Sequence, residues 1–184
     1  MKHLHLLLIS CVVIFGLPLA QGRDVPHTPS ATAQAQTEIL ASYFWDMDAA
    51  FDKSGAPQPF WFSKNIPPLR LSFSKDGQVF AENACNSLNW KFKVTDSEKI
   101  TFTPTVATAM GCAEEEAQRE NLVRREIPKT HRFMLKTTST KGPERLTLYL
   151  ANGSQWEFKP TPTPEKRYGG PGRQIELELS LIHI

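Results

Sequence analysis

The chain contains too few histidines for most histidine-based chemistry. Its 184 residues include five, which are His3, His5, His27, His131 and His183. Only His131 falls in the central part of the chain, and no acid stands near it at metal-ligand spacing. One histidine cannot build a zinc site, so its ordinary interpretation is a surface residue of a strand. We therefore predict no metal ion and no cofactor.

Sequence motifs of enzymes and of nucleic-acid binding are also missing. The chain has no phosphate-binding loop and no GxGxxG, GxSxG or HExxH pattern, so no nucleophile–base pair can be assigned. The acids Glu114–Glu116 could attract calcium, but successive residues of a helix do not face one another. With 21 basic and 19 acidic residues and no basic stripe among aromatics, nothing indicates nucleic-acid binding. We predict no catalytic residue and disfavour an enzyme.

A long uninterrupted hydrophobic segment is lacking as well. The apolar run Leu6–Leu19 is short and is broken by Gly and Pro, which disfavours a stable membrane span. With Lys2 before it and the small residues of Ala20–Gly22 after it, the run is typical of a secretory signal peptide over residues 1–22. Cys11 lies inside the run rather than at its end, so we expect no lipid on it. We expect a periplasmic or secreted protein, with a retained anchor as the alternative.

Only two cysteines remain after the leader, Cys85 and Cys112. Two cysteines in an exported chain favour one disulfide. It would close a loop of about 28 residues and stabilise the fold by roughly 3–4 kcal/mol. The alternatives are buried free thiols and a reactive pair. A reactive Cys112 would gain from its place before a helix, but the glutamates that follow it oppose a thiolate.

The rest of the chain divides into three parts. Residues 23–38 are rich in Pro, Thr, Ala and Gln and have no apolar period, so we predict a disordered linker. Residues 39–160 form one ordered domain. Residues 161–184 are a Pro- and Gly-rich tail, in which residues 174–182 alternate in part. We consider an edge strand there, or a segment that does not belong to the domain.

Most of the ordered domain has the period of β-strands. Trp90, Phe92 and Val94 alternate with polar residues, the pattern of a half-buried strand. Asp76–Gly77 and Asn152–Gly153 are typical hairpin turns. The strands predicted in this way cover residues 43–47, 69–73, 78–84, 90–95, 100–102, 131–137, 144–150 and 156–158. The sequence therefore predicts a mainly β domain of the α+β class.

One segment, Ala113–Ile127, has helical character instead, and we predict that it is the only long helix. Acids crowd its first turn and arginines its last turn, which suits the helix dipole. Glu115–Arg119 and Glu120–Arg124 have the spacing of stabilising i,i+4 ion pairs. The apolar stripe of this segment is thin, so we expect the helix to lie on the surface.

The pattern around the two cysteines resembles the META domain, the family of the bacterial heat-shock protein HslJ. The resemblance covers residues 39–159. It is carried by a tryptophan in the first strand, a Pro-Pro-Leu-Arg-Leu-Ser-Phe segment, a Cys-Asn pair, a Thr-x-Met-x-Cys element and an acid of the helix. These residues are Trp45, residues 67–73, Cys85, Asn86, Thr108, Met110, Cys112 and Glu120. The long Pro-rich ends depart from the family pattern.

The resemblance implies a fold and a role for this chain. The fold would be an antiparallel sheet or a small, partly closed barrel with one helix packed on it. Trp45, Asn86, Thr108, Met110 and Glu120 would be structural motif residues. The implied function is that of an exported, non-catalytic protein of the bacterial envelope, with a binding or structural role linked to envelope stress.

Aromatic side chains are the remaining candidates for binding. Phe60, Trp61 and Phe62 stand in a loop-like stretch and form either a binding patch or part of the core. A second hypothesis is a carrier that encloses a small apolar ligand inside the barrel, between Trp90, Phe92, Phe133 and Trp156. A secreted protease inhibitor with a rigid loop is a further alternative. We expect a monomer whose partner is an envelope protein or a small apolar ligand.

Overall fold

The computed structural model describes residues 31–104, 110–138 and 142–169, and within them the chain forms one antiparallel sheet of eight strands. The strands lie in the order β5-β4-β3-β2-β1-β8-β7-β6. Their bounds are Tyr43–Phe51 for β1, Arg70–Phe73 for β2, Gln78–Glu82 for β3, Leu88–Val94 for β4, Ile100–Pro104 for β5, Thr130–Thr138 for β6, Gly142–Leu150 for β7 and Gln155–Pro162 for β8. The predicted signal peptide lies outside the described residues.

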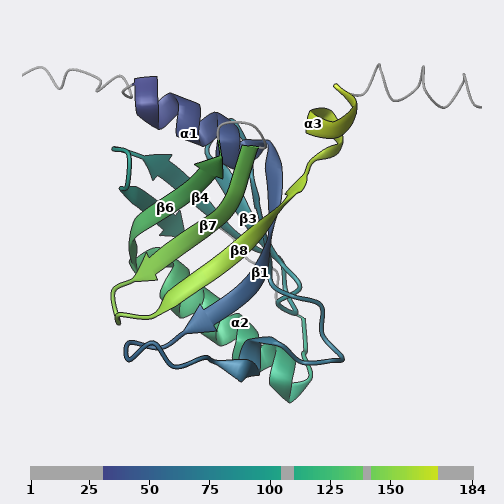
Figure 1. Cartoon of the computed structure of the whole chain (residues 1–184). Coiled ribbons are helices and arrows are strands. Elements are labelled where there is room, and N and C mark those ends of the chain that lie inside the picture. The colour runs from purple at the N-terminus through teal and green to yellow at the C-terminus, as the bar shows by residue number, and fades with distance from the viewer. Residues whose placement is uncertain (1–30, 105–109, 139–141, 170–184) are drawn as a thin grey trace, which may run out of the picture.

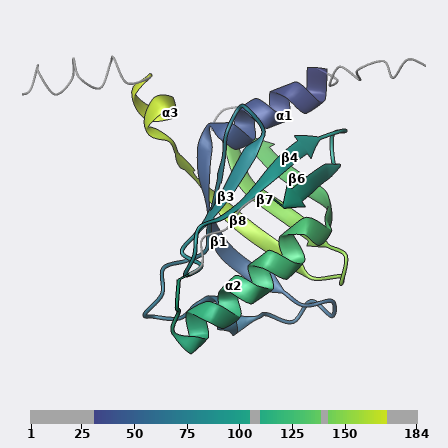
Figure 2. The ribbon, with the colours of Figure 1, turned by 180° about the vertical axis from the view of Figure 1, so that it is seen from behind.

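The two end strands of the sheet meet, so the sheet curls into a nearly closed barrel (Figures 1 and 2). The backbone N–H of Phe133 on β6 donates to the carbonyl of Glu98, just before β5, at 2.9 Å. Arg132 forms an ion pair with the Glu98 carboxylate at 3.3 Å. The predicted mainly β fold, a partly closed barrel with helix packed on it, is confirmed.

Alternation along the strands fills the barrel interior. On β4, Leu88, Trp90, Phe92 and Val94 are buried, and the residues between them are half-buried or exposed. Trp90 pairs with Val79 of β3. Apolar residues on one face of each strand thus meet those of the neighbouring strands and build one core. The predicted period-2 segments all correspond to strands of the barrel.

Both predicted hairpin turns are present. Gly77 has φ of +82° and Gly153 has φ of +85°, a backbone conformation that glycine adopts without steric cost. A side chain on Gly77 would also meet the carbonyl oxygen of Phe92 at 3.2 Å. Asn152 supports the second turn, because its side-chain oxygen accepts from the N–H of Ser154 at 2.9 Å.

The predicted central helix is α2 (Glu114–Glu126), and it lies at one end of the barrel (Figure 2). The predicted helix, Ala113–Ile127, extends one residue beyond it at each end, where Ala113 and Ile127 are its caps. The side chains that it buries are unexpected, because three of them are charged: Arg119, Glu120 and Glu126. The prediction of a surface helix with a thin apolar stripe missed this polar buried face.

The predicted disordered linker over residues 23–38 is wrong in its second half. Helix α1 (Ala31–Ala41) lies at the barrel end opposite α2 (Figure 1). Ala33 and Leu40 on it have no exposed surface, and the indole Nε1–H of Trp45 donates to the Leu40 carbonyl at 3.0 Å. Only two of the eleven residues of α1 are buried, so the sequence shows no apolar period there. Its composition did favour a helix, because Ala, Gln, Glu and Leu are good helix formers. Accordingly, α2 is not the only long helix.

The predicted boundary between the domain and the Pro- and Gly-rich tail, at residue 161, is also wrong. Strand β8 continues to Pro162 and pairs Thr161 with Phe44 of β1. A short helix follows, α3 (Pro164–Tyr168), and the Thr163 side chain caps it. The pairing of β8 with β1 extends through residues 161 and 162, so these residues belong to the strand despite their proline content. The segment 174–182, a candidate edge strand, lies outside the described residues.

Two short 3-10 turns complete the elements, η1 (Pro59–Trp61) and η2 (Ile127–Lys129). The first follows β1, and the second joins α2 to β6. No helix within residues 31–104, 110–138 and 142–169 has the length and apolar content needed to cross a membrane.

Candidate functional site

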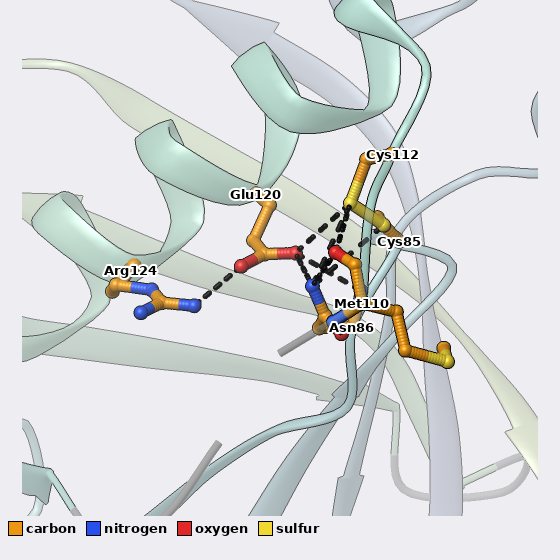
Figure 3. Close-up of polar contacts among 6 residues, drawn as sticks. All are labelled: Cys85, Asn86, Met110, Cys112, Glu120 and Arg124. Atoms are coloured by element: carbon orange, nitrogen blue, oxygen red, sulfur yellow. Dashed lines mark hydrogen bonds and ion pairs between the residues drawn. A yellow bond between two sulfur atoms is a disulfide. The ribbon is translucent and has the colours of Figure 1, made fainter. Parts of the chain in front are cut away.

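Cys85 and Cys112 form a disulfide at the end of the barrel where α2 begins (Figure 3). Their Cα atoms lie 5.9 Å apart, inside the range of about 4.4–6.8 Å that a disulfide tolerates. Cys85 has φ of +49° and Asn83 has φ of +64°, so the connection between β3 and β4 turns sharply just before the bridge. The disulfide predicted from the sequence is confirmed.

Asn86 holds the segment before α2 and the helix itself. Its backbone N–H and its side-chain Nδ2 both donate to Oε2 of Glu120, at 3.0 and 2.8 Å. Its Oδ1 accepts from the backbone N–H of Met110 at 2.8 Å, and Nδ2 also lies 3.3 Å from the Met110 carbonyl. Figure 3 shows these contacts beside the disulfide. Asn86 and Glu120 are both buried.

The motif residues therefore fall into different places. Asn86, Met110 and Glu120 meet at the disulfide, whereas Trp45 lies in the core and contacts α1. Thr108 lies outside the described residues. Met110 is 66% exposed, and its side chain leads away from the disulfide in Figure 3. Its backbone rather than its thioether therefore makes the contacts with Asn86.

Two charged pairs were predicted on α2, and one of them forms. Arg124 bonds Oε1 of Glu120, as the i,i+4 spacing predicts. Arg119 does not pair with Glu115. It has no exposed surface, and its guanidinium donates to the carbonyls of Pro67, Asn83 and Trp61 at 2.6, 3.3 and 3.0 Å. Burial lowers the pKa of Arg119 below its ordinary value.

A cavity of about 310 Å³ opens beside this cluster. It is lined by Asn86, Met110, Cys112, Ala117, Glu120, Asn121 and Arg124, most of which are polar. Sγ of Cys112 lies 3.9 Å from Oε2 of Glu120. Among the described residues, the group Cys85, Cys112 and Glu120 places three potential metal-ligand atoms within 4.8 Å of one another. We name these three residues the Cys–Glu cluster.

The candidate patch Phe60, Trp61 and Phe62 is divided by burial. Trp61 is 2% exposed and packs edge-to-face on Trp156, with ring centroids 4.7 Å apart. Phe60 is half-buried, and Phe62 is 43% exposed. Trp61 is therefore a core residue that reaches the surface at one edge, while the two phenylalanines lie further out.

A second cavity, of about 460 Å³, lies between η1 and α2. We call it the aromatic groove and define it by Phe60, Trp61, Leu122 and Trp156, which form its apolar wall. Glu126 and Asn152 stand at its polar side, where Nδ2 of Asn152 donates to Glu126 at 3.3 Å. Phe62 is not part of its lining.

The groove could not be assembled from the sequence. Its walls come from η1, α2 and β8, which only the fold brings together. Leu122 had no role assigned to it from the sequence, and Asn152 was predicted only as part of a hairpin turn. The Phe-Trp-Phe run was the one visible signal, and it identified one wall.

Comparison with known proteins concerns the domain that carries these sites. The family model described as META domain matches residues 44–163. Among solved structures, a protein from Burkholderia xenovorans has a TM-score of 0.56 at 19% identity, covering 80% of this chain and 99% of that chain. A DUF4847 family protein from Bacteroides vulgatus has a TM-score of 0.51 at 11% identity, covering 70% and 99%. No curated protein matches. At these identities the likeness concerns the fold.

Proposed function

Since this chain belongs to the META domain family, we propose that it is an exported, non-catalytic domain protein of the bacterial envelope that binds its partner through the aromatic groove. Its role is binding or structural and is linked to envelope stress. The observation that carries the binding role is the groove itself, an apolar wall with a small polar side at the protein surface.

The dimensions and lining of the groove suit a small apolar ligand or one apolar side chain of a partner protein. Its volume of about 460 Å³ lies in the range of roughly 300–1,000 Å³ that is usual for ligand sites. Trp61 and Trp156 are rigid through their mutual packing, so the wall is preformed. Asn152 and Glu126 at the other side supply groups that can orient a ligand.

Export is supported by the leader and by the cysteines. Residues 1–22 have the composition of a signal peptide. Disulfides persist in oxidising compartments and are rare in the cytosol, so the Cys85–Cys112 bridge favours the periplasm or the exterior. Fractionation of the native cells tests this part, and recovery of the protein in the cytosolic fraction with reduced cysteines would contradict it.

A carrier with its ligand inside the barrel is the second candidate, and the groove suits a ligand better. Trp90, Phe92, Phe133 and Trp156, the expected lining, belong to one core and are exposed by 6% or less. A ligand among them would have to displace core contacts, which costs the packing energy of those side chains. The groove requires no such opening.

The experiment compares binding by two variants. Leu122→Glu places a charge on the groove wall, and Phe62→Ser removes an exposed aromatic outside it. The purified protein is immobilised and exposed to a solubilised envelope fraction, and a partner retained by the wild type is then scored on both variants. We expect Leu122→Glu to lose the partner and Phe62→Ser to keep it.

Circular dichroism of both variants verifies that each is folded. Equal retention by the wild type and Leu122→Glu would show that the groove is not the binding surface. The same pair of variants is then titrated with an apolar fluorescent dye, whose binding quenches Trp61 and Trp156. If Leu122→Glu loses dye binding and Phe62→Ser keeps it, a small ligand is favoured over a protein partner.

A further inference from the structure

We propose that reduction of the Cys85–Cys112 disulfide converts the Cys–Glu cluster into a binding site for a divalent metal ion of the zinc type. The cluster offers two sulfur atoms and one carboxylate oxygen, all within 4.8 Å of one another. Thiolate and carboxylate are both zinc ligands. The disulfide occupies both sulfurs, so the site exists only in the reduced protein.

The spacing of the ligand atoms agrees with tetrahedral zinc. Zn–S bonds of about 2.3 Å and Zn–O bonds of about 2.0–2.2 Å place neighbouring ligand atoms roughly 3.5–3.8 Å apart. Sγ of Cys112 already lies 3.9 Å from Oε2 of Glu120. Once the disulfide is reduced, the two sulfurs need to separate only by side-chain rotation, because the Cα atoms of Cys85 and Cys112 lie 5.9 Å apart.

Glu120 is held in place for this role by its neighbours. It is 6% exposed, Arg124 bonds its Oε1, and Asn86 donates to its Oε2 from both the backbone and the side chain. A metal ion on Oε2 would replace the hydrogen bond from Nδ2 of Asn86 to this oxygen. Nδ2 would keep its other contact, to the Met110 carbonyl at 3.3 Å. Hydrogen bonds of this kind orient metal-ligating carboxylates.

Charge and access also agree with a bound cation. Arg124 neutralises Glu120 in the oxidised protein. After reduction, two thiolates would balance a divalent ion, so the net charge of the cluster does not change. The cavity of about 310 Å³ reaches Cys112 and Glu120 and provides an entry path. It also leaves the fourth position to water, as in zinc sites with three protein ligands.

The chemistry has two balanced steps. A dithiol reductant gives two electrons and two protons to the disulfide, which becomes two thiols while the reductant becomes a cyclic disulfide. The metal ion then displaces the two thiol protons, which leave to solvent, and binds the thiolates and the Glu120 carboxylate. The resulting complex holds one metal ion per chain.

The experiment uses Co²⁺ as the probe, because its thiolate complexes absorb light. The purified full chain carries Cys11→Ser, so that Cys85 and Cys112 are its only cysteines. It is reduced with dithiothreitol, freed of reductant without air, and titrated with CoCl₂. We expect a thiolate-to-cobalt charge-transfer band that saturates at one equivalent and is abolished by ZnCl₂. The oxidised protein should give no band.

A matched pair of variants tests the part played by Glu120. Glu120→Gln keeps the shape but removes the carboxylate, and Glu115→Gln removes an exposed acid of the same helix. We expect Glu120→Gln to bind Co²⁺ more weakly by roughly 10–100-fold or more, and Glu115→Gln to bind like the wild type. X-ray absorption of the zinc-loaded wild type should show two sulfur neighbours, with oxygen completing the shell.

Any of four results would overturn the proposal. One is a reduced protein that stays folded by circular dichroism and shows no thiolate band. Another is equal affinity of Glu120→Gln and the wild type, or an absorption spectrum with fewer than two sulfurs. If reduction unfolds the metal-free protein, ZnCl₂ must restore the circular dichroism spectrum, because metal binding then drives folding; failure to restore it also contradicts the site.

Discussion

The side-chain amide of Asn86 donates a hydrogen bond to the carboxylate of Glu120, 2.8 Å away and 34 residues later in the chain. The backbone N–H of Asn86 donates to the same oxygen, and the neighbouring residue Cys85 is bridged to Cys112. One covalent bond and two hydrogen bonds to a charged group therefore attach α2 to the β3–β4 connection. Polar and covalent contacts thus hold the helix at the barrel end beside its buried apolar residue Val123.

Asn86→Ala tests this attachment. The change removes a hydrogen bond to a buried carboxylate, worth about 1.5–3 kcal/mol, and leaves the Met110 N–H without its acceptor. We expect the free energy of unfolding to fall by at least that amount in urea denaturation. Asn121→Ala, an exposed position of the same helix, should change it by less than about 0.5 kcal/mol. Equal effects of the two variants would contradict the attachment.

Arg119→Lys tests a second polar contact of α2. The guanidinium donates to three backbone carbonyls, those of Trp61, Pro67 and Asn83. An ammonium group cannot reproduce this planar fork. At least one buried carbonyl loses its donor, so we expect a loss of about 1–3 kcal/mol in the free energy of unfolding.

The control for Arg119→Lys is Arg124→Lys on the same helix. The Arg124 side chain is 52% exposed, and the charge beside Glu120 is retained. Because the substitution keeps a cation on this largely exposed side chain, we expect a change of about 1 kcal/mol or less. Urea denaturation of both variants separates the two cases. A smaller effect at Arg119 than at Arg124 would show that its carbonyl contacts do not stabilise the fold.

The sequence predicted the strands well because they have a clear period, and the barrel was what the resemblance to the META domain implied. Trp90, Phe92 and Val94 alternate with polar residues, and burial follows that alternation in the structure. Hairpin turns were equally visible, since Asn152–Gly153 suits only a few backbone conformations. The disulfide followed from there being two cysteines after a predicted signal peptide. Each of these signals is local or depends on residue type alone.

The polar buried face of α2 could not be predicted, because two acid–arginine pairs with the same i,i+4 spacing behave differently in the structure. Glu115–Arg119 and Glu120–Arg124 look alike in the sequence, yet only the second pair forms. Arg119 turns instead to carbonyls supplied by loops elsewhere in the chain. Sequence patterns do not show where loop carbonyls will stand, so the partners of a buried charge follow from the fold. The aromatic groove, assembled from three elements, was hidden for the same reason.

The disulfide should protect both cysteines and stabilise the fold. Iodoacetamide should label neither Cys85 nor Cys112 in the native protein until a reductant is added. Cys112→Ser should lower the free energy of unfolding by roughly 3–4 kcal/mol, because the unfolded chain regains the freedom that the bridge removes. Mass spectrometry and urea denaturation measure the two effects. Two thiols labelled without reductant would contradict the bridge.

Asp52 predicts a pH-dependent contribution from the loop after β1. Hydrogen bonds from the Ser54 hydroxyl and from the N–H groups of Ala56 and Ser54 hold the pKa of Asp52 below its ordinary value of 3.8. A group whose pKa is lowered by folding stabilises the fold above its unfolded pKa and loses this effect as pH falls through its folded pKa. Asp52→Ala should therefore lower the urea midpoint near neutral pH, and the difference should shrink below pH 3.8. A difference that is constant with pH would contradict the assignment.

Leu40→Ala tests whether α1 belongs to the domain, contrary to the linker that the sequence predicted. Leu40 has no exposed surface, and its carbonyl accepts from Trp45 at 3.0 Å, so α1 and the core are joined at this residue. Truncating a buried leucine costs about 2–5 kcal/mol when the surroundings do not collapse into the cavity. We expect a loss of that size in the free energy of unfolding, together with a red shift of Trp45 emission. Gln34→Ala on the exposed side of α1 should change stability by less than about 0.5 kcal/mol. If Leu40→Ala also left the free energy of unfolding unchanged, α1 would contribute nothing to the stability of the core.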